Sequence, residues 1–332
     1  MKVYRDADVA RNVMQGVPAA IIGYGNQGHA HALNLADSGV EVVVGARRGG
    51  GGWQRAEADG FKPLEVSEAV AAADYVVVLL PDEVQAGAFE GEILPHLRRG
   101  ATLVFAHGFT ITFGEIDPPQ GHDVILVAPK GQGHFLRKLY TQDQGLMCLV
   151  AVERDASGHA RDKMLSYAQM LGCLRAGAIE TTFREEAVTD LFGEQVVLCG
   201  GVPALVKAAF ETLVENGYDP QVAYIECLHE LQIITDLMSR GGVQFMREKI
   251  SRTAAWGSYV AEQAIVTGEV KSKMRSILKS IESGDFARGW RKETDDGQER
   301  LGRYIAAEAK HPIESAGIPV RALMSYLKED DS

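Results

Sequence analysis

One stretch near the start of the chain decides the fold: Ala19-Ala20-Ile21-Ile22-Gly23-Tyr24-Gly25-Asn26-Gln27-Gly28. Its four apolar residues are typical of a short buried strand, and the glycine-rich turn that follows opens a helix over His29–Ala36. In such a turn the first glycine permits a sharp bend and the second lets the backbone approach a pyrophosphate. The third lets the helix pack closely on the sheet. A bare match could be only a tight turn, but the strand-turn-helix context favours dinucleotide binding.

The chain up to about Val152 alternates short β-branched runs with amphipathic or Ala-rich stretches. This alternation predicts an α/β domain with a mostly parallel, doubly wound sheet of the Rossmann type and helices on both faces. A helix near His159–Leu171 and a last strand near Ala176–Thr181 complete this part. The other predicted strands are Ala19–Ile22, Val40–Val44, Tyr75–Leu80, Thr102–Ala106, Val124–Ala128 and Leu146–Val152.

The pattern then changes, because apolar residues recur at helical intervals with few strand-like runs. A chain of 332 residues also exceeds the usual span of one hydrophobic core. We therefore expect the α/β domain over residues 1–181, an all-helical domain over 182–327 and a frayed polar tail over 328–332. Gly217, Asp219-Pro220 and Gly241-Gly242 mark helix ends and starts. The predicted helices are Ala187–Leu198, Val202–Asn216, Pro220–Ser239, Ser258–Thr267 and Glu269–Ser283.

The composition excludes several classes of protein. The formal net charge is −11, from 45 acidic against 34 basic side chains, which argues against binding to nucleic acid or to an anionic membrane. The four cysteines form no Cys-x-x-Cys pair, so neither a zinc site nor a disulfide framework is indicated. The N-terminus lacks the apolar segment of a signal peptide, and we expect no run that approaches the length of a membrane span. A cytoplasmic protein is expected.

The residues after the second predicted strand bear on the choice of cofactor. An NAD-preferring enzyme usually places an Asp or Glu there to bond the ribose 2′-hydroxyl. This strand runs instead into Gly45-Ala46-Arg47-Arg48, and guanidinium groups suit a 2′-phosphate. The loop continues as Gly49–Gly52, which could cradle a phosphate or be simply flexible. NADPH is the expected cofactor, although Arg47 and Arg48 could also be merely solvated.

Polar residues follow three further strands, and ligands of open α/β sheets lie beyond the carboxyl ends of the strands. The segment Asp82-Glu83-Val84-Gln85 follows one strand, His107 follows the next, and Lys130 and Gly133 follow the third. Together they could line the nicotinamide half of the site. His107 could equally be a hydrogen-bonded loop residue, whereas a cation at Lys130 could hold an acidic substrate.

Two pairs of acids stand at helical spacing: Asp190 with Glu194, and Glu226 with Glu230. Positions i and i+4 share one helical face, and oxygen ligands select hard cations such as Mg²⁺, so four carboxylates suit two ions. A single such pair is usually a solvated face or part of a salt bridge. Both pairs, however, lie among apolar residues without local Lys or Arg, so a metal site is favoured. The neighbouring Glu185 and Glu186 are interpreted as ordinary acids at a helix start.

Taken together, these motifs resemble the ketol-acid reductoisomerases of the short, class I type. The likeness spans essentially the whole chain, and no single motif would suffice. It rests on Gly23–Ala32, Ala106-His107-Gly108-Phe109, Ala128-Pro129-Lys130-Gly131, Asp190-Leu-Phe-Gly-Glu194, Glu226-Cys-Leu-His-Glu230 and Ile250-Ser251.

The resemblance implies roles for these residues. Asp190 would be shared by both Mg²⁺ ions, Glu194 would bind one of them, and Glu226 and Glu230 would bind the other. His107 would be the catalytic-site histidine, Lys130 would support the metal cluster, Glu230 is the candidate proton shuttle and Ser251 would contact the substrate. Glu226, Glu230 and Ser251 would come from a second chain, which makes a homodimer the minimum active unit, and the helical domain would be knotted. The implied cofactor contacts are Tyr24–Gln27, Arg47, Asp82–Gln85 and Gly133.

The implied reaction is a Mg²⁺-dependent alkyl migration in 2-acetolactate or 2-aceto-2-hydroxybutyrate, followed by reduction with NADPH to a 2,3-dihydroxy acid of valine and isoleucine biosynthesis. The chain departs from the family at Gly50 and Gly52, where members that favour NADPH commonly have serines. Loss of two hydroxyl contacts, at about 0.5–1.5 kcal/mol each, would weaken the preference for NADPH without creating a preference for NADH. NADPH is therefore still expected, with NADH also usable. A β-hydroxy-acid dehydrogenase without metal and a nucleotide-sensing regulatory protein are the rival interpretations, and the paired carboxylates argue against both.

Overall fold

The computed structural model describes residues 1–324, and the chain divides into two compact units, Met1–Thr189 and the part from Asp190 onward. The division falls inside helix α8 (Phe183–Gly193), later than the boundary expected after residue 181. The buried ring of Phe183 packs against Phe105, with ring centroids 6.2 Å apart, so α8 starts on the core of the first unit. The tail predicted over 328–332 lies outside the described residues.

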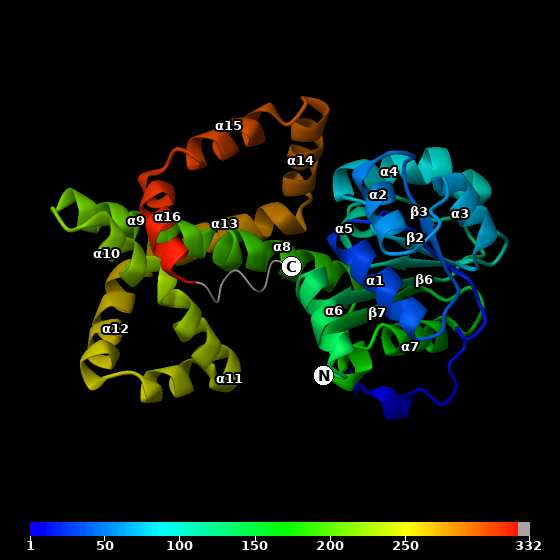
Figure 1. Ribbon diagram of the computed structural model, residues 1–332, viewed down its shortest axis with the longest axis horizontal. Coiled ribbons are helices and arrows are strands. Elements are labelled where there is room, and N and C mark those ends of the chain that lie inside the picture. Colours follow the sequence, from blue (N-terminus) through cyan, green and yellow to red (C-terminus); the bar gives the residue numbers. More distant parts are fainter. Residues whose placement is uncertain (325–332) are drawn as a thin grey trace. The chain divides into compact units, whose positions relative to one another are not determined.

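The first unit contains an eight-stranded sheet in the order β1-β8-β7-β6-β5-β4-β2-β3. Its neighbours from β3 to β6 pair in parallel, which confirms the doubly wound fold (Figure 1). By contrast, β7 is antiparallel to β6, and the short β1 is antiparallel to β8. The strands are β1 (Val3–Tyr4), β2 (Ala19–Ile22), β3 (Val42–Gly45), β4 (Tyr75–Val78), β5 (Thr102–Phe105), β6 (Val124–Pro129), β7 (Cys148–Arg154) and β8 (Ala178–Glu180).

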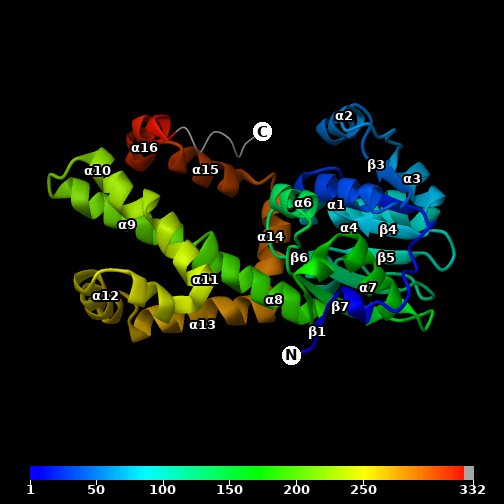
Figure 2. The ribbon, with the colours of Figure 1, turned by 60° about the horizontal axis from the view of Figure 1, so that its bottom comes forward.

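Alternation along β2 divides its side chains between two cores. Ala19 and Ile21 lie in one core, with residues of α1, α6 and α7, whereas Ala20 and Ile22 lie in the other, with residues of α3 and α4. Helices therefore cover both faces of the sheet (Figures 1 and 2). The helices of this unit are α1 (Asn26–Asp37), α2 (Gly51–Ala58), α3 (Val66–Ala72), α4 (Asp82–Ala88), α5 (Phe109–Thr112), α6 (Gly133–Thr141) and α7 (Ala160–Met170). Because the strands from β2 to β6 are parallel, the segments that follow them open at one edge of the sheet.

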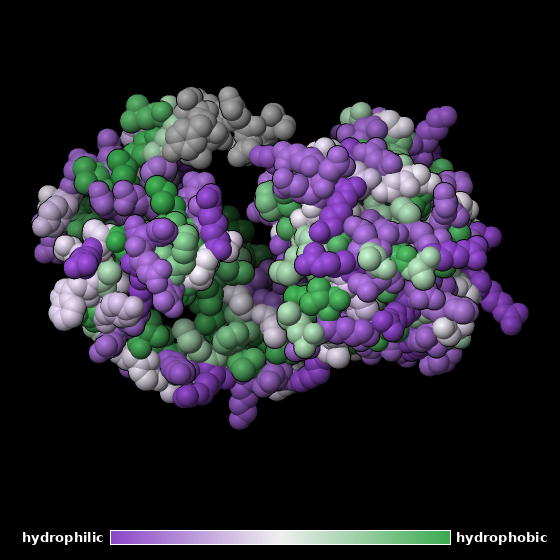
Figure 3. Space-filling model, turned by 90° about the horizontal axis from the view of Figure 1, so that it is seen from below, coloured by the Kyte–Doolittle hydropathy of each residue, from purple (hydrophilic) through white to green (hydrophobic). Residues whose placement is uncertain are grey.

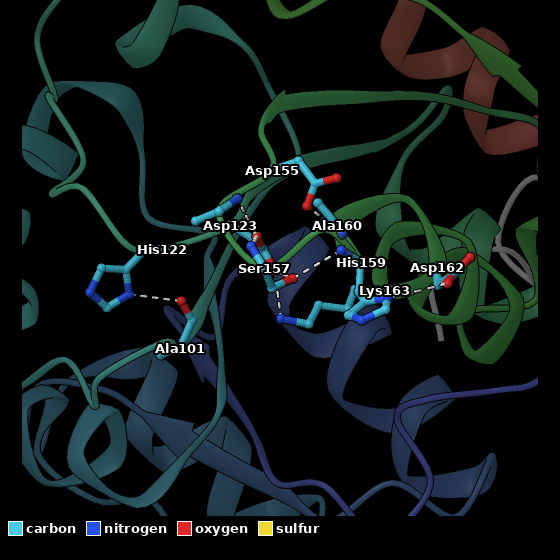
Figure 4. Close-up of polar contacts among 10 residues, drawn as sticks. Ala101, His122, Asp123, Asp155, Ser157, His159, Ala160, Asp162 and Lys163 are labelled. Atoms are coloured by element: carbon cyan, nitrogen blue, oxygen red, sulfur yellow. Dashed lines mark hydrogen bonds and ion pairs between the residues drawn. The ribbon is translucent and has the colours of Figure 1, made fainter.

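At the opposite edge of the sheet, Asp123 directly precedes β6 and is only 1% exposed. Its carboxylate accepts hydrogen bonds from the backbone of Ala156 and Ser157, from the Ser157 hydroxyl and from Lys163 Nζ (Figure 4). Burial raises the pKa of this carboxyl, but the bonds from Lys163 and Ser157 outweigh burial and hold the pKa below its ordinary value. This cluster fixes the loop between β7 and α7.

Every regular element described from residue 194 to residue 324 is helical, which confirms the all-helical prediction. Gly242, with φ 83° and ψ 176°, interrupts α11 at the predicted stop, and the helix then resumes. The knot implied by the resemblance stays a prediction. The elements are the π-helical turn η5 (Glu194–Leu198), α9 (Gly201–Glu215), α10 (Pro220–Tyr224), the π-helical turn η6 (Ile225–His229), α11 (Leu231–Lys249), α12 (Arg252–Ile265), α13 (Gly268–Glu282), α14 (Asp285–Asp295), α15 (Glu299–Glu308) and α16 (Pro312–Leu323).

One helical run corrects an expectation from the sequence. Together α8, η5 and α9 form a run over Phe183–Glu215 that is long and apolar enough, by length and composition alone, to cross a membrane. The expectation that no run approaches the length of a membrane span is therefore wrong. Only 17% of its apolar window is buried inside the chain. The run therefore leaves apolar surface that the described residues, 1–324, do not cover.

Candidate functional site

The glycine turn between β2 and α1 is shaped by contacts that exclude side chains. Gly23 has φ +93°, and a Cβ on it would lie 2.9 Å from the carbonyl oxygen of Leu79. A Cβ on Gly28 would lie 2.0 Å from the carbonyl oxygen of Gly23, so helix and turn are in the close contact expected of the third glycine. Apart from Gly25 itself and its two chain neighbours, no described residue has an atom within 4 Å of a Cβ built on Gly25. The start of α1 is thus open to a ligand such as a pyrophosphate.

The loop after β6 packs on this turn. The Gly133 amide donates to Asn26 Oδ1 at 2.6 Å, and Gln27 Nε2 donates to the Gly131 carbonyl oxygen at 2.9 Å. Tyr24 is buried, and its hydroxyl donates to Asp59 Oδ2 at 2.8 Å. Four of the predicted cofactor residues, Tyr24, Asn26, Gln27 and Gly133, therefore lie together.

The loop after β3 carries the predicted 2′-phosphate residues. Arg47 and Arg48 are both exposed, and Arg48 Nε donates to Glu65 Oε1 at 2.9 Å. Gly50 is the N-cap of α2, in extended backbone with φ −75° and ψ 166°. Gly52 lies in the first turn of α2, where a Cβ would be 3.3 Å from the carbonyl oxygen of Tyr24. The start of α2 therefore packs against the glycine turn.

The first turn of α4 consists of Asp82, Glu83, Val84 and Gln85. Asp82 Oδ2 lies 3.4 Å from His107 Nδ1, so the structure brings these two predicted site residues together. The Gln85 amide is 5% exposed; it donates to the Leu80 carbonyl oxygen and accepts from the Thr110 hydroxyl. Its side chain therefore bonds within the fold, whereas Val84 is 47% exposed.

Glu186 contradicts its interpretation as an ordinary acid at a helix start, because it is 1% exposed. Its Oε1 accepts from Lys130 Nζ at 2.7 Å, and its Oε2 accepts from the Gly108 amide at 2.8 Å. The carboxylate thus joins the loop after β5 to the loop after β6. The sequence carries a signal for the position of Glu186, though not for its burial, because Glu186, Asp190 and Glu194 are spaced four residues apart and so share one helical face.

His107, Glu186 and Asp190 form a group that could hold a metal ion. One ligand atom from each lies within 4.8 Å of the others. Asp190 follows Glu186 by about one turn of α8, so the helix itself fixes their relative positions. Two carboxylates and an imidazole suit a divalent cation, and the Lys130 ammonium offsets part of the negative charge.

Glu194, Glu226 and Glu230 stand outside this group in the described part of a single chain, and all three are exposed. Glu194 starts one π-helical turn and Glu226 lies in the other, and such turns occur frequently at functional sites. Ser251 is the N-cap of α12, and its hydroxyl oxygen accepts from the Ala254 amide at 3.1 Å. The group that could hold a metal ion in the described residues therefore includes Asp190 but not the other three predicted metal ligands.

Comparison with known proteins gives matches over both units. Residues 13–177 match the family model for the acetohydroxy acid isomeroreductase NADPH-binding domain, and residues 183–326 match that for the ketol-acid reductoisomerase C-terminal domain. The structure of an NADH-preferring ketol-acid reductoisomerase from an uncultured archean is similar over 98% of this chain and 100% of that chain. The identity is 42% and the TM-score is 0.95.

Two solved structures are more distant. One is a putative oxidoreductase from Jannaschia sp. CCS1, with 16% identity, 80% of this chain and 97% of that chain covered, and a TM-score of 0.59. The other is a semialdehyde dehydrogenase NAD-binding protein from Cupriavidus necator, with 17% identity, coverage of 80% and 98%, and a TM-score of 0.61. At these identities the likeness shows the fold alone. The two family models and the match at 42% identity together show that the chain belongs to the ketol-acid reductoisomerases, nicotinamide-dependent oxidoreductases of branched-chain amino acid biosynthesis.

Proposed function

We propose that the chain converts 2-acetolactate or 2-aceto-2-hydroxybutyrate to the corresponding 2,3-dihydroxy acid. An alkyl group migrates to the neighbouring carbonyl, and one hydride and one proton reduce the new ketone. The products are 2,3-dihydroxy-isovalerate and 2,3-dihydroxy-3-methylvalerate, respectively. The observation that carries the proposal is the buried Glu186 with His107 and Asp190 beside it, at the sheet edge that also carries the glycine turn.

Two Mg²⁺ ions are proposed, with Asp190 shared by both, Glu194 on one, and Glu226 and Glu230 on the other. The four-residue spacing along α8 supports the pairing of Asp190 with Glu194, and the ligand group around Asp190 supports a cation at Asp190. When bound, the ions would hold the substrate oxygens, lower the pKa of the substrate hydroxyl and polarise the carbonyl.

The chain's own residues would orient the reacting groups. Asp82 positions the His107 ring through its contact with Nδ1, and Glu186 positions the Lys130 ammonium through their ion pair. Glu230 is the proposed proton shuttle, and Ser251 the proposed substrate contact. As an N-cap the Ser251 hydroxyl accepts a bond from the backbone, which leaves its O–H able to donate.

NADPH is the proposed cofactor, with NADH also usable. Arg47 and Arg48 are exposed on the loop between β3 and α2, and Gly50 and Gly52 supply no hydroxyl. A relative with 42% identity is described as NADH-preferring, so family membership alone does not fix the preference.

A homodimer is proposed as the minimum active unit, with Glu226, Glu230 and Ser251 supplied by a second copy. The helical unit has a small buried core around Phe210, Tyr224 and Ile313. Large apolar side chains such as Leu198, Trp256 and Ile305 are exposed on it, and Figure 3 shows apolar surface there. A second copy would cover this surface and the apolar run Phe183–Glu215, which supports a cytoplasmic location over a membrane one.

The test is oxidation of NADPH and of NADH with acetolactate, with and without Mg²⁺, for the native chain and for Asp190→Asn. We expect turnover that requires Mg²⁺, and its loss in the variant with NADPH binding retained, because the substitution removes a charged ligand. Glu185→Gln is the matched control, because Glu185 is exposed and adjacent to Glu186. Unchanged turnover in Asp190→Asn would remove the metal assignment. Turnover in EDTA would favour a metal-free dehydrogenase, and tight NADPH binding without oxidation would favour a regulatory protein.

A further inference from the structure

The loop after β3 contains no acidic residue of its own. An acidic residue from another segment of the chain lies at the end of β3 instead. The Leu64 amide donates to the Val44 carbonyl oxygen at 2.9 Å, and the Ala46 amide donates to the Leu64 carbonyl oxygen at 3.0 Å. Leu64 thus pairs with the end of β3, as a parallel bridge to Gly45. Glu65 follows directly and is the N-cap of α3.

The Glu65 carboxylate holds one of the two arginines. Arg48 Nε donates to its Oε1 at 2.9 Å, and the Arg48 guanidinium lies 5.5 Å from the centre of the Trp53 ring. The ring is itself held, because Trp53 Nε1 donates to Glu57 Oε1 at 2.9 Å. Arg48 therefore contacts both an acid and an aromatic face.

Arg47 is differently placed. It is exposed, and in the described part of the chain its guanidinium makes no ion pair. Its carbonyl oxygen accepts from the Gly50 amide at 3.0 Å, which shapes the turn before α2. Arg47 can therefore meet a 2′-phosphate without first leaving another acid, whereas Arg48 cannot.

We propose that Glu65 is a residue that determines cofactor specificity, lowering the affinity for NADPH and supporting that for NADH. The inference rests on the proposed binding of the cofactor at the glycine turn. In this fold the end of the second parallel strand is where the 2′-substituent of the adenine ribose is recognised. A phosphate there meets a carboxylate of like charge and competes with it for Arg48, whereas the 2′-hydroxyl of NADH finds an acceptor.

The size of the effect follows from the exposure of the pair. The Arg48 side chain is 71% exposed and that of Glu65 is 37% exposed, so solvent screens their charges. Interactions of this kind correspond to changes in affinity of about threefold to fivefold. Added salt should reduce them further.

The experiment compares Glu65→Gln with Glu68→Gln. Glu68 is exposed on the same helix, and its Oε2 accepts only from the backbone amide of Glu65, at 3.3 Å, among the described contacts. Dissociation constants of NADPH and NADH are measured by nucleotide fluorescence, without substrate or metal. In Glu65→Gln we expect the NADPH constant to fall about threefold to fivefold and the NADH constant to stay or rise. Glu68→Gln should leave the ratio of the two constants unchanged.

A second variant pair tests the route through the arginine. In an Arg48→Gln background, Glu65→Gln should change NADPH binding less than in the native chain, and high salt should shrink the effect in both. Equal changes for the two nucleotides, or the same shift in Glu68→Gln, would overturn the proposal. If the native chain binds the nucleotides normally but does not turn over acetolactate, the proposed reaction is refuted and the proposed role of Glu65 is not affected. A native chain that binds neither nucleotide would refute both.

Discussion

Glu186 shows how one side chain can connect the fold to the site. It is 1% exposed, and a buried carboxylate is tolerated only with strong partners, which are Lys130 and the Gly108 amide. These partners belong to loops that follow two neighbouring strands. The carboxylate of Glu186 therefore holds these two loops together at the sheet edge where His107 and Asp190 lie.

Replacement of Glu186 by Gln should lower both stability and turnover. Gln keeps the shape but weakens the bond to Lys130, so we expect a loss of about 2–4 kcal/mol in unfolding free energy. We expect turnover to fall by about a hundredfold with NADPH affinity unchanged, because the catalytic groups are displaced while the glycine turn is not. Thermal unfolding, turnover and nucleotide titration measure the three effects. Glu185→Gln, at an exposed position, is the control, and equal losses in the two variants would contradict the assignment.

His31 predicts how stability depends on pH. It is fully buried, with Nδ1 2.7 Å from the Tyr167 hydroxyl, and burial lowers its pKa to about 3. In the unfolded chain the pKa is about 6.5, so as the pH falls below that value the unfolded state takes up a proton that the folded state refuses. The stability that this group contributes is complete above about pH 6.5 and is lost toward about pH 3, by up to about 1.4 kcal/mol per unit.

The variant His31→Asn tests this dependence. We expect it to be less stable than the native chain near neutral pH, with a difference that narrows as the pH falls to about 4.5, because Asn does not titrate. Unfolding temperatures across this range give the result. His159→Asn, at an exposed position, should run parallel to the native chain. A constant gap between native and His31→Asn would contradict the argument.

At the scale of elements, the parallel strands could be predicted because each signal is local. The bounds of β2 coincide with its apolar run, and the glycine turn begins at the next residue. The antiparallel direction of β7 could not be predicted, because it depends on pairing with β6 rather than on the residues of β7 themselves. The helical stop at Gly242 was predictable, but the return of the helix after it was not.

The residues of the candidate site likewise fall into those that the sequence could predict and those that it could not. The sequence alone indicated Asp190 and His107, through helical spacing and a strand-end position. The burial of Glu186 and the place of Glu65 depend on contacts with loops far away in the chain, such as those made by Gly108 and Leu64. Local propensity carries no information about such contacts, so an acid at a helix start gives the same local signal whether it is solvated or buried.

The start of α2 yields a prediction about cofactor binding. Gly50 is its N-cap but offers no side chain, and its extended backbone accepts a serine, although a Cβ would lie 3.1 Å from the Arg47 carbonyl oxygen. Gly50→Ser should cap the helix, for a few tenths of a kcal/mol, and should tighten NADPH about threefold by a hydroxyl bond to the 2′-phosphate, without changing NADH. Titration with both nucleotides measures this. As a control, the variant Gly49→Ser should be less stable than the native chain, because Gly49 has a φ of +69°, which a serine rarely adopts. If Gly50→Ser tightened NADH binding by the same factor, the introduced hydroxyl would not be bonded to the 2′-phosphate.

At the scale of the whole molecule, the two units differ in how much of their apolar surface they bury. The first unit has two cores on the two faces of its sheet. The second has one small core, and most of the large apolar side chains exposed in the described chain belong to it. Exposed apolar surface of this kind supports the proposal that a second copy of the chain packs there. The proposed second copy would cover it and complete the acid set at once.

Trp256 provides the test of this arrangement, because it is 73% exposed on α12, the helix that Ser251 caps. Trp256→Glu should shift the protein to monomers, because a charge buried at an interface costs several kcal/mol, and turnover should fall with dimer content. Nucleotide binding should persist, because the glycine turn lies in the first unit. Light scattering after gel filtration, turnover and NADPH titration on one preparation separate these effects. Leu94→Glu, at an exposed apolar position of the first unit, should remain dimeric and active. A fully active, dimeric Trp256→Glu would place the interface on another face of the helical unit.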